Sequence, residues 1–149
     1  MRPDEIFADI KLKFPEASQE DGTKAVVIPR ESLPEFARYL KESALAFDNL
    51  HCVTATDRKE RFEVVYIFYS LQKRHTVTVK VNLAPQDLKV ESLAGLWRSA
   101  DWLERETYDL LGITFLNHPD PRRILNPYDW KGHPLKKDYE HPNMVKKPR

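Results

Sequence analysis

The chain has 149 residues, 41% hydrophobic and 32% charged, which is enough to bury one core and too apolar for disorder throughout. Its single cysteine, Cys52, excludes a self-contained iron–sulfur cluster held by several thiolates. The N-terminus is charged from Arg2 onward, so we expect no signal peptide. The longest apolar run covers only residues 64–69, whereas a transmembrane helix needs about 20 apolar residues. We therefore expect membrane association only through a partner.

The first part of the chain predicts a helix, a strand and a second helix. Asp4 is expected to cap a helix that ends at Pro15, and residues 25–28 favour a short strand. Ser32 and Glu35 have the spacing of a capping box, in which each side chain bonds the backbone N–H of the other. An amphipathic helix is predicted to follow.

Three strands are predicted next, over residues 50–56, 62–71 and 76–83. The second is apolar on both faces and should be central, whereas the third alternates between apolar and polar residues, as a half-exposed strand does. The short polar connections favour an antiparallel meander. The predicted class is α+β: an antiparallel sheet, mixed with the one N-terminal strand, covered by helices on one face.

A last helix is predicted over residues 100–111. Ser92 is expected to cap a turn before it, and Gly112 occupies the position at which a residue of positive φ ends a helix. The predicted globular domain covers residues 1–115.

Residues 116–149 differ in composition and predict an extended C-terminal arm. They contain six of the 11 prolines and carry a net charge of +4, against −3 for the remaining residues. Scattered large apolar residues without periodicity suggest a segment that docks on a partner. We expect the arm to be sparsely tied to the body beyond about Asn126 and to order on binding. Truncation after Pro127 should then leave the domain folded.

Independent chemistry is not indicated. The four glycines are too far apart for a dinucleotide or phosphate loop. His118, His133 and His141 lack metal-ligand spacing, so we expect loop histidines that make hydrogen bonds. Glu106 lies near the apolar edge of its helix, and we expect it to pair with Arg122 or Arg123 rather than act as an acid or base.

A family signature covers about 40 positions. Residues 100–115 read ADWLERETYDLLGITF, followed by His118 and Pro119, by RRIL at 122–125 and by DWKGHPLKKDY at 129–139. This pattern resembles the signature of the 30-kilodalton subunit family of respiratory complex I, whose members are of type C, and departs from it at Leu111 and Pro121. The residues that match the signature, which we expect to serve interface and structural roles, are Trp102, Glu104, Arg105, Glu106, Asp109, Gly112, His118, Pro119, Arg122, Arg123, Trp130, Gly132, Pro134, Leu135, Lys137, Asp138 and Tyr139.

The resemblance implies a non-catalytic peripheral-arm subunit of a complex I-type, proton-translocating NADH:quinone oxidoreductase. Such a subunit stabilises the quinone-reducing module by packing on the large subunit of type D, which helps form the quinone site, near neighbours of types B and I. It carries no catalytic residue, metal or cofactor, because flavin and iron–sulfur clusters reside on other subunits. Its implied location is the cytoplasmic face of the inner membrane, held peripherally.

Other interpretations remain open. The nearest is the equivalent subunit of a membrane-bound hydrogenase, an F420H2 dehydrogenase or a ferredoxin-fed photosynthetic complex. A nucleic-acid-binding module would use the basic tail, but the acidic body argues against nucleic acid. A stand-alone enzyme would depend on Glu106.

Overall fold

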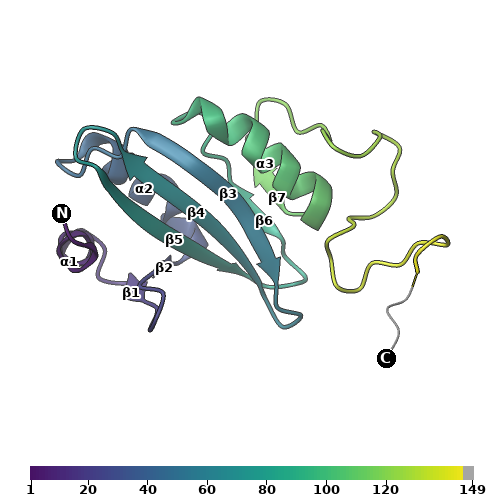
Figure 1. Cartoon of the computed structure of the whole chain (residues 1–149), viewed down its shortest axis with the longest axis horizontal. Helices are drawn as coiled ribbons and strands as arrows, with labels where there is room; N and C mark the ends of the chain where they lie inside the picture. Colours follow the sequence, from purple (N-terminus) through teal and green to yellow (C-terminus); the bar gives the residue numbers. More distant parts are fainter. Residues whose placement is uncertain (146–149) are drawn as a thin grey trace.

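A computed structural model describes residues 1–145, so the last four residues of the predicted arm lie outside the described residues (Figure 1). The helices and strands occur in the order α1 (Pro3–Lys13), β1 (Ser18–Gln19), β2 (Val26–Ile28), the 3-10 turn η1 (Arg30–Ser32), α2 (Leu33–Glu42), β3 (Asn49–Asp57), β4 (Phe62–Ser70), β5 (His75–Leu83), β6 (Lys89–Glu91), α3 (Arg98–Leu111) and β7 (Thr114–Leu116).

The main sheet is mixed, which confirms the predicted α+β class. β3, β4 and β5 form the antiparallel meander, while β2 pairs with β5 in parallel. The strand order is β1-β2-β5-β4-β3. The predicted central position of β4 in the three-strand meander is confirmed, because β4 pairs with β3 on one side and with β5 on the other. β2 extends the sheet beyond β5.

One face of this sheet carries the core. Phe62, Val64, Tyr66 and Phe68 alternate along β4 and are almost completely buried, as expected for inward positions of a strand. In the view of Figure 1, α2 lies behind the sheet, α1 lies at its left-hand side, and α3 lies beside β3. All three helices contribute to one apolar cluster.

The outer edge of β3 is covered by α3. The hydroxyl group of Ser99 donates to the carbonyl oxygen of Leu50 (2.8 Å), and that of Thr107 donates to the carbonyl oxygen of Val53 (3.1 Å). Such edge carbonyls would otherwise lack hydrogen-bond donors. These two bonds fix how α3 is placed against the sheet.

Two predicted helix starts differ from the structure. α1 begins at Pro3, with the carboxylate of Glu5 accepting from the backbone N–H of Arg2 (3.0 Å), so Asp4 is not the cap. Ser32 closes η1 in a helical conformation and donates its hydroxyl to Glu16 (2.8 Å). The predicted capping box is therefore wrong, because η1 already leads the chain into α2.

A second, two-stranded sheet connects the two ends of α3. β6 and β7 pair in parallel, with Val90 opposite Phe115. Ser92 accepts a hydrogen bond from the N–H of Ala94 (3.1 Å), which confirms the predicted capped turn. The chain beyond Phe115 therefore starts from a fixed position beside α3.

Candidate interface around the last helix

α3 buries polar as well as apolar side chains. Ala100, Glu104 and Leu111 recur at helical spacing and are buried, so they mark the inner face of the helix. Trp102, by contrast, is 62% exposed, and Glu106 is exposed as well. The prediction placed the apolar face near Trp102, on the wrong side of the helix.

The predicted pairing of Glu106 is therefore wrong. Within residues 1–145, Glu106 forms no hydrogen bond or ion pair. Arg122 instead binds Asp120 through two hydrogen bonds of 2.6 and 2.7 Å, and Arg123 binds Asp109 at 2.8 Å. Both arginines thus pair with carboxylates other than the predicted one.

Asp109 anchors the start of the C-terminal segment, which we define as residues 117–145. Its Oδ2 accepts from the backbone N–H groups of residues 124–126, at 2.7 to 3.1 Å. Its Oδ1 accepts from the side-chain amide of Asn126 (2.9 Å) and from Arg123. One fully buried carboxylate thus satisfies five donors.

The electrostatics of Asp109 follow from these contacts. Burial by itself would raise the pKa of this carboxyl group, because it disfavours the charged form. The hydrogen bonds from Asn126, Arg123 and the backbone outweigh burial and hold the pKa of Asp109 well below its ordinary value. The segment is therefore attached through an ionised side chain.

Both glycines of the signature lie beneath an aromatic ring. Gly112 has φ of 75°, which confirms the predicted helix end, and a Cβ there would lie 2.7 Å from His133. His133 donates from Nδ1 to the carbonyl oxygen of Asp109 (2.9 Å). Gly132 has φ of 82°, and a Cβ there would lie 2.9 Å from Tyr139. Both positions require glycine for conformation and for space.

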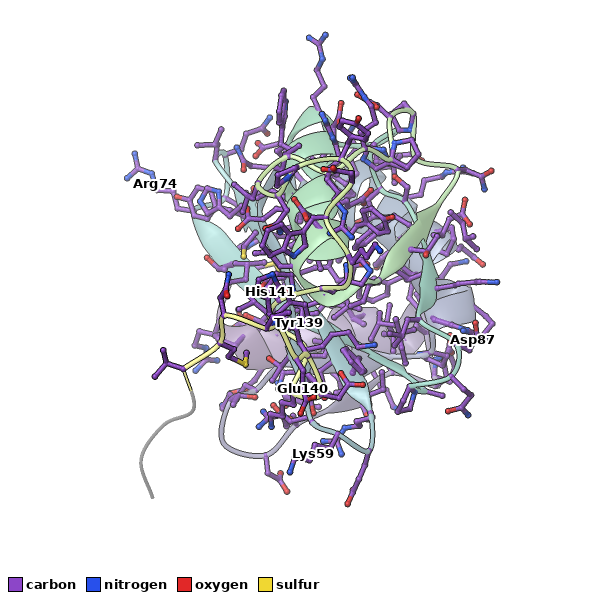
Figure 2. The ribbon with its side chains drawn as sticks, turned by 90° about the vertical axis from the view of Figure 1, so that its right-hand side faces the viewer. Lys59, Arg74, Asp87, Tyr139, Glu140 and His141 are labelled. Atoms are coloured by element: carbon purple, nitrogen blue, oxygen red, sulfur yellow. The ribbon has the colours of Figure 1, made fainter. Side chains whose placement is uncertain are left out.

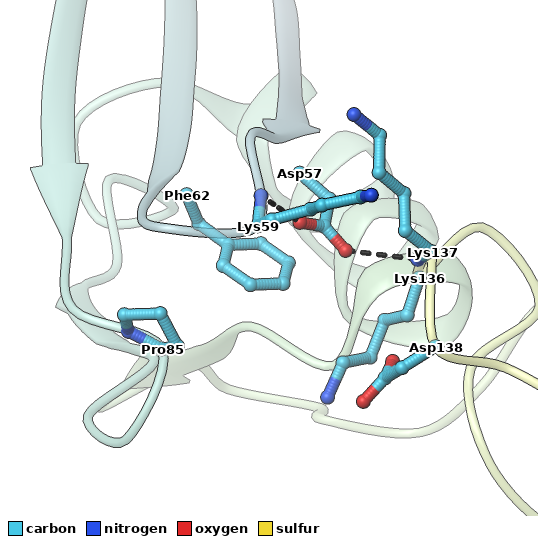
Figure 3. Close-up of a pocket in the computed structure, with 7 residues that line it drawn as sticks. All are labelled: Asp57, Lys59, Phe62, Pro85, Lys136, Lys137 and Asp138. Atoms are coloured by element: carbon cyan, nitrogen blue, oxygen red, sulfur yellow. Dashed lines mark hydrogen bonds between the residues drawn. The ribbon is translucent and has the colours of Figure 1, made fainter.

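The segment then follows the end of α3 to the β3–β4 turn. The N–H of Leu135 donates to the carbonyl oxygen of Leu110 (2.9 Å), and that of Lys137 donates to the Asp57 carboxylate (2.8 Å; Figure 3). The expectation that little holds the chain beyond Asn126 is therefore wrong, because buried acceptors on the body continue to bind it as far as Lys137.

A shallow basic cavity of about 270 Å³ opens beside Asp57 (Figure 3). Burial tends to raise the pKa of Asp57, but the N–H groups of Lys137 and Lys59 outweigh it and hold the pKa below its ordinary value. The cavity is lined by Asp57, Lys59, Phe62, Pro85, Lys136, Lys137 and Asp138.

The tip of the segment is an aromatic cluster. The indole N–H of Trp130 donates to the hydroxyl of Tyr139 (3.1 Å), and the ring of His141 stacks on Trp130 with centroids 5.2 Å apart. In Figure 2, Tyr139 and His141 lie close together near the middle of the view, above Lys59. Trp130 and Tyr139 thus stabilise the segment itself.

Glu104 is a second buried acid, with different surroundings. Its carboxyl oxygens accept from the hydroxyl of Ser92 (2.5 Å) and the N–H of Leu93 (2.7 Å). Burial raises the pKa of Glu104 to about 7, against the opposing effect of these donors. His118 lies 3.7 Å away, and its Nε2 donates to the carbonyl oxygen of Asp101 (3.0 Å).

The side chain of Arg105 connects α3 to the C-terminal segment. Its Nε–H donates to the carbonyl oxygen of Arg122 (2.9 Å), and its guanidinium lies 4.9 Å from the centre of the Trp102 ring. Pro119 and Asp138 are exposed, Pro134 is half-buried, and none of these three carries a buried contact of its own here.

Several contacts escaped the sequence analysis. His118, His133 and His141 do make hydrogen bonds, as expected of loop histidines. Asp57 and Asn126 were not anticipated, because no local spacing connects either to its partner far along the chain. The position of Asn126 just before Pro127 was the one available signal of a turn.

Fold and site together define a small α+β domain whose C-terminal segment is clamped to its last helix by buried polar groups. A family model described as the 30 Kd subunit of respiratory-chain NADH dehydrogenase matches residues 26–145. The chain belongs to this family.

Individual relatives agree. A type C chain of NADH-quinone oxidoreductase from Geobacter sulfurreducens is 43% identical over 122 residues, covering 79% of this chain and 75% of the relative. A longer NADH-quinone oxidoreductase chain of Aeromonas salmonicida, whose name combines types C and D, is 38% identical over 137 residues, covering 85% of this chain and 23% of that one. These relatives place the chain among the 30 Kd subunits of NADH:quinone oxidoreductase complexes.

A solved structure shares the fold. It is described as the trypsin-resistant fragment (1-134) of Nqo5, with a TM-score of 0.70 and 33% identity, covering 80% of this chain and 99% of the fragment. In the part of the chain that the structure describes, no helix is long and apolar enough to cross a membrane. Over the same residues, no group of three or more His, Cys, Asp or Glu side chains is arranged to hold a metal ion.

Proposed function

We propose that this chain is a non-catalytic peripheral-arm subunit of a complex I-type NADH:quinone oxidoreductase, which stabilises the quinone-reducing module by packing on the large type D partner, here called the quinone-site subunit. Its residues supply contact surface rather than chemistry. Electron transfer would take place on other subunits, which hold the flavin and the iron–sulfur clusters.

One observation carries this proposal: the C-terminal segment binds the body through polar groups and turns large apolar side chains outward. Leu125 is 60% exposed, Tyr128 94% and Leu135 58%. Residues 124–126 and 135, which include two of these three, bind the body through their backbone N–H groups. Concentrated exposed apolar groups mark interaction surfaces, whereas single ones are ordinary.

The Aeromonas salmonicida relative supports the quinone-site subunit as the partner. In that protein a sequence like this one forms 23% of a single chain whose name combines types C and D. Joining two subunits in one chain requires that they work in the same assembly. The C-terminal segment presents exposed apolar side chains, and these could contact the type D portion.

The remaining assignments follow from membership of the complex. We infer contacts with further peripheral-arm subunits of types B and I, and a peripheral position at the cytoplasmic face of the inner membrane. We infer no cofactor on this chain, so the absorption spectrum of the pure protein should show aromatic bands alone. Stoichiometric flavin or iron in that spectrum would contradict this inference.

The proposal can be tested by replacing Leu125, Tyr128 and Leu135 together with Ser in cells that produce the whole complex. The amount of quinone-site subunit recovered with the tagged chain should fall at least about tenfold, because a loss of 1.4 kcal/mol of binding energy already has that effect.

A matched control is the double variant Leu12→Ser and Leu71→Ser, which alters apolar residues that are 87% and 62% exposed in α1 and the β4–β5 turn. This variant should retain the quinone-site subunit. Normal recovery of that subunit with the triple variant would show that the interface lies elsewhere.

A further inference from the structure

Arg105 is a buried cation whose hydrogen-bonding capacity is largely unused. The residue is only 8% exposed, yet a guanidinium carries five N–H donors. The Nε–H is bound to Arg122, and for the other four no acceptor lies within hydrogen-bond distance among residues 1–145. These four N–H donors are therefore available to an acceptor from outside the described residues.

Asp120 does not fill this role. One of its carboxylate oxygens lies 3.5 Å from Nη1 of Arg105, beyond an ordinary hydrogen bond. Both oxygens are already bound by Arg122, at 2.6 and 2.7 Å. The negative charge of Asp120 therefore partly balances the positive charge of Arg105, but Asp120 accepts no hydrogen bond from it.

A cavity of about 240 Å³ lies beside the guanidinium, between α3, β7 and the chain that follows β7. It is smaller than the ~300–1,000 Å³ of typical small-ligand pockets, and it suits one large side chain. Its walls are Glu104, Arg105, Tyr108, Thr114, Phe115, His118 and Pro121.

The polar walls of the cavity leave Arg105 as the group that selects an occupant. Glu104 is fully buried and directs its oxygens to Ser92 and Leu93. His118 is engaged with the backbone of Asp101 and Asp120. The Trp102 ring, which is not one of the cavity walls, stacks on the guanidinium. A group that enters the cavity thus meets the apolar surfaces of Tyr108, Phe115 and Pro121 and the free N–H donors of the Arg105 guanidinium.

We propose that this cavity receives a carboxylate side chain from the partner subunit, bound by the free N–H groups of Arg105. A carboxylate matches the two-pronged geometry of a guanidinium, and charge-assisted pairs of this kind are strong when water is excluded. The inference rests on the proposed function, because it requires a partner at α3. Trp102, 62% exposed on the same helix, would lie at the centre of that contact.

Zero-length crosslinking tests this directly. A carbodiimide joins a carboxylate to an amine in contact with it, so Arg105→Lys places a reactive amine at the site. Thr114→Lys, at an exposed position on the cavity wall, does so while leaving Arg105 intact. In the intact purified complex, Lys at either position should crosslink to the same Asp or Glu of another subunit.

Controls separate the possible failures. Thr76→Lys on the exposed face of β5 and Arg122→Lys should give no link to that residue. An assembled complex in which the introduced amines at 105 and 114 link only within this chain, or not at all, would overturn the inference. If Arg105→Lys prevents assembly, the crosslink formed by Thr114→Lys in the assembled complex tests the inference by itself. Failure of the wild-type chain to recover the quinone-site subunit would contradict the proposed function instead.

Discussion

The body and the C-terminal segment of this protein are held by different forces. Residues up to Phe115 bury a large apolar core, whereas within residues 117–145 no apolar side chain is part of that core. The segment is instead attached through a few acceptors on the body: Asp109, Leu110 and Asp57. Apolar burial is non-directional, but each hydrogen bond to these acceptors fixes one donor atom of the segment in place.

This difference explains how one short chain can bury an apolar core and still turn large apolar side chains outward. A segment held by apolar contacts would turn its large side chains inward. A segment held by its backbone leaves them outward, as Leu125 and Tyr128 are. Substitutions in the apolar core should therefore destabilise the whole molecule, whereas substitutions of the acceptors should release only the segment.

The largest effect is expected from the apolar core. Phe68 is fully buried and packs against Phe47 and Trp97. Phe68→Ala should lower the free energy of unfolding by about 3–5 kcal/mol, the usual cost of deleting a buried ring. Urea titration followed by circular dichroism measures this. An unchanged midpoint would mean that this part of the core does not limit stability.

The next effect should be confined to the segment. Asp109→Asn removes the charge that balances Arg123 and turns an acceptor into a donor, which should cost about 3 kcal/mol. Native-state hydrogen exchange should show faster exchange at the amides of 124–137 while β4 and β5 keep their protection.

The matched control for this variant is Asp120→Asn, at a surface pair whose loss should cost far less than that of the buried one. Equal acceleration throughout the molecule in Asp109→Asn would contradict the separation of body and segment.

The two buried acids should give opposite pH dependence. Glu104 has a raised pKa of about 7, so its folded form holds a proton that the unfolded chain releases above about pH 4.5. Its contribution is present at low pH and is lost as the pH rises from about 4.5 through 7, by about 2–3 kcal/mol. Asp109, with a lowered pKa, contributes above its ordinary value and loses that contribution as the pH falls below about 4.

Glu104→Gln should therefore flatten the decline in stability between pH 5 and pH 8, as measured by urea titrations at several pH values. Glu106→Gln, two positions along on the exposed side of α3, should retain the decline. A flat profile in the wild-type chain would show that Glu104 is ionised when folded.

The smallest effect is expected at Gly112. Alanine in the left-handed region costs about 1–2 kcal/mol, and the added Cβ would also displace the ring of His133. The loss of stability should appear in the melting temperature. Gly95→Ala, where a Cβ has open space, is the control. Similar losses at both glycines would contradict the role of backbone conformation at Gly112.

Local patterns in the sequence were sufficient where neighbours along the chain decide the structure. Alternation along residues 76–83 marked the inward side chains of β5, and Gly112 marked the end of α3. The mixed sheet was also predicted, with β4 between β3 and β5.

Predictions failed where the partner lies far along the chain or where the wrong face of a helix was taken as the inner one. Glu104 and Glu106 are two positions apart, which is about 200° around a helix, so placing the apolar face on the side of Trp102 exchanged their roles. Asp109 was assigned to the signature, but its five donors come from residues 123–126, and no periodicity indicates which carboxylate will collect them.

The hydroxyl groups of Ser99 and Thr107 have a consequence for the time before assembly. Before assembly, newly synthesised copies of the subunit are present together without their partner. An open strand edge would allow two copies to pair edge to edge and aggregate. Because α3 covers the carbonyl oxygens of Leu50 and Val53, that part of the β3 edge is closed to a second copy. The same helix that carries the signature thereby protects the unassembled pool.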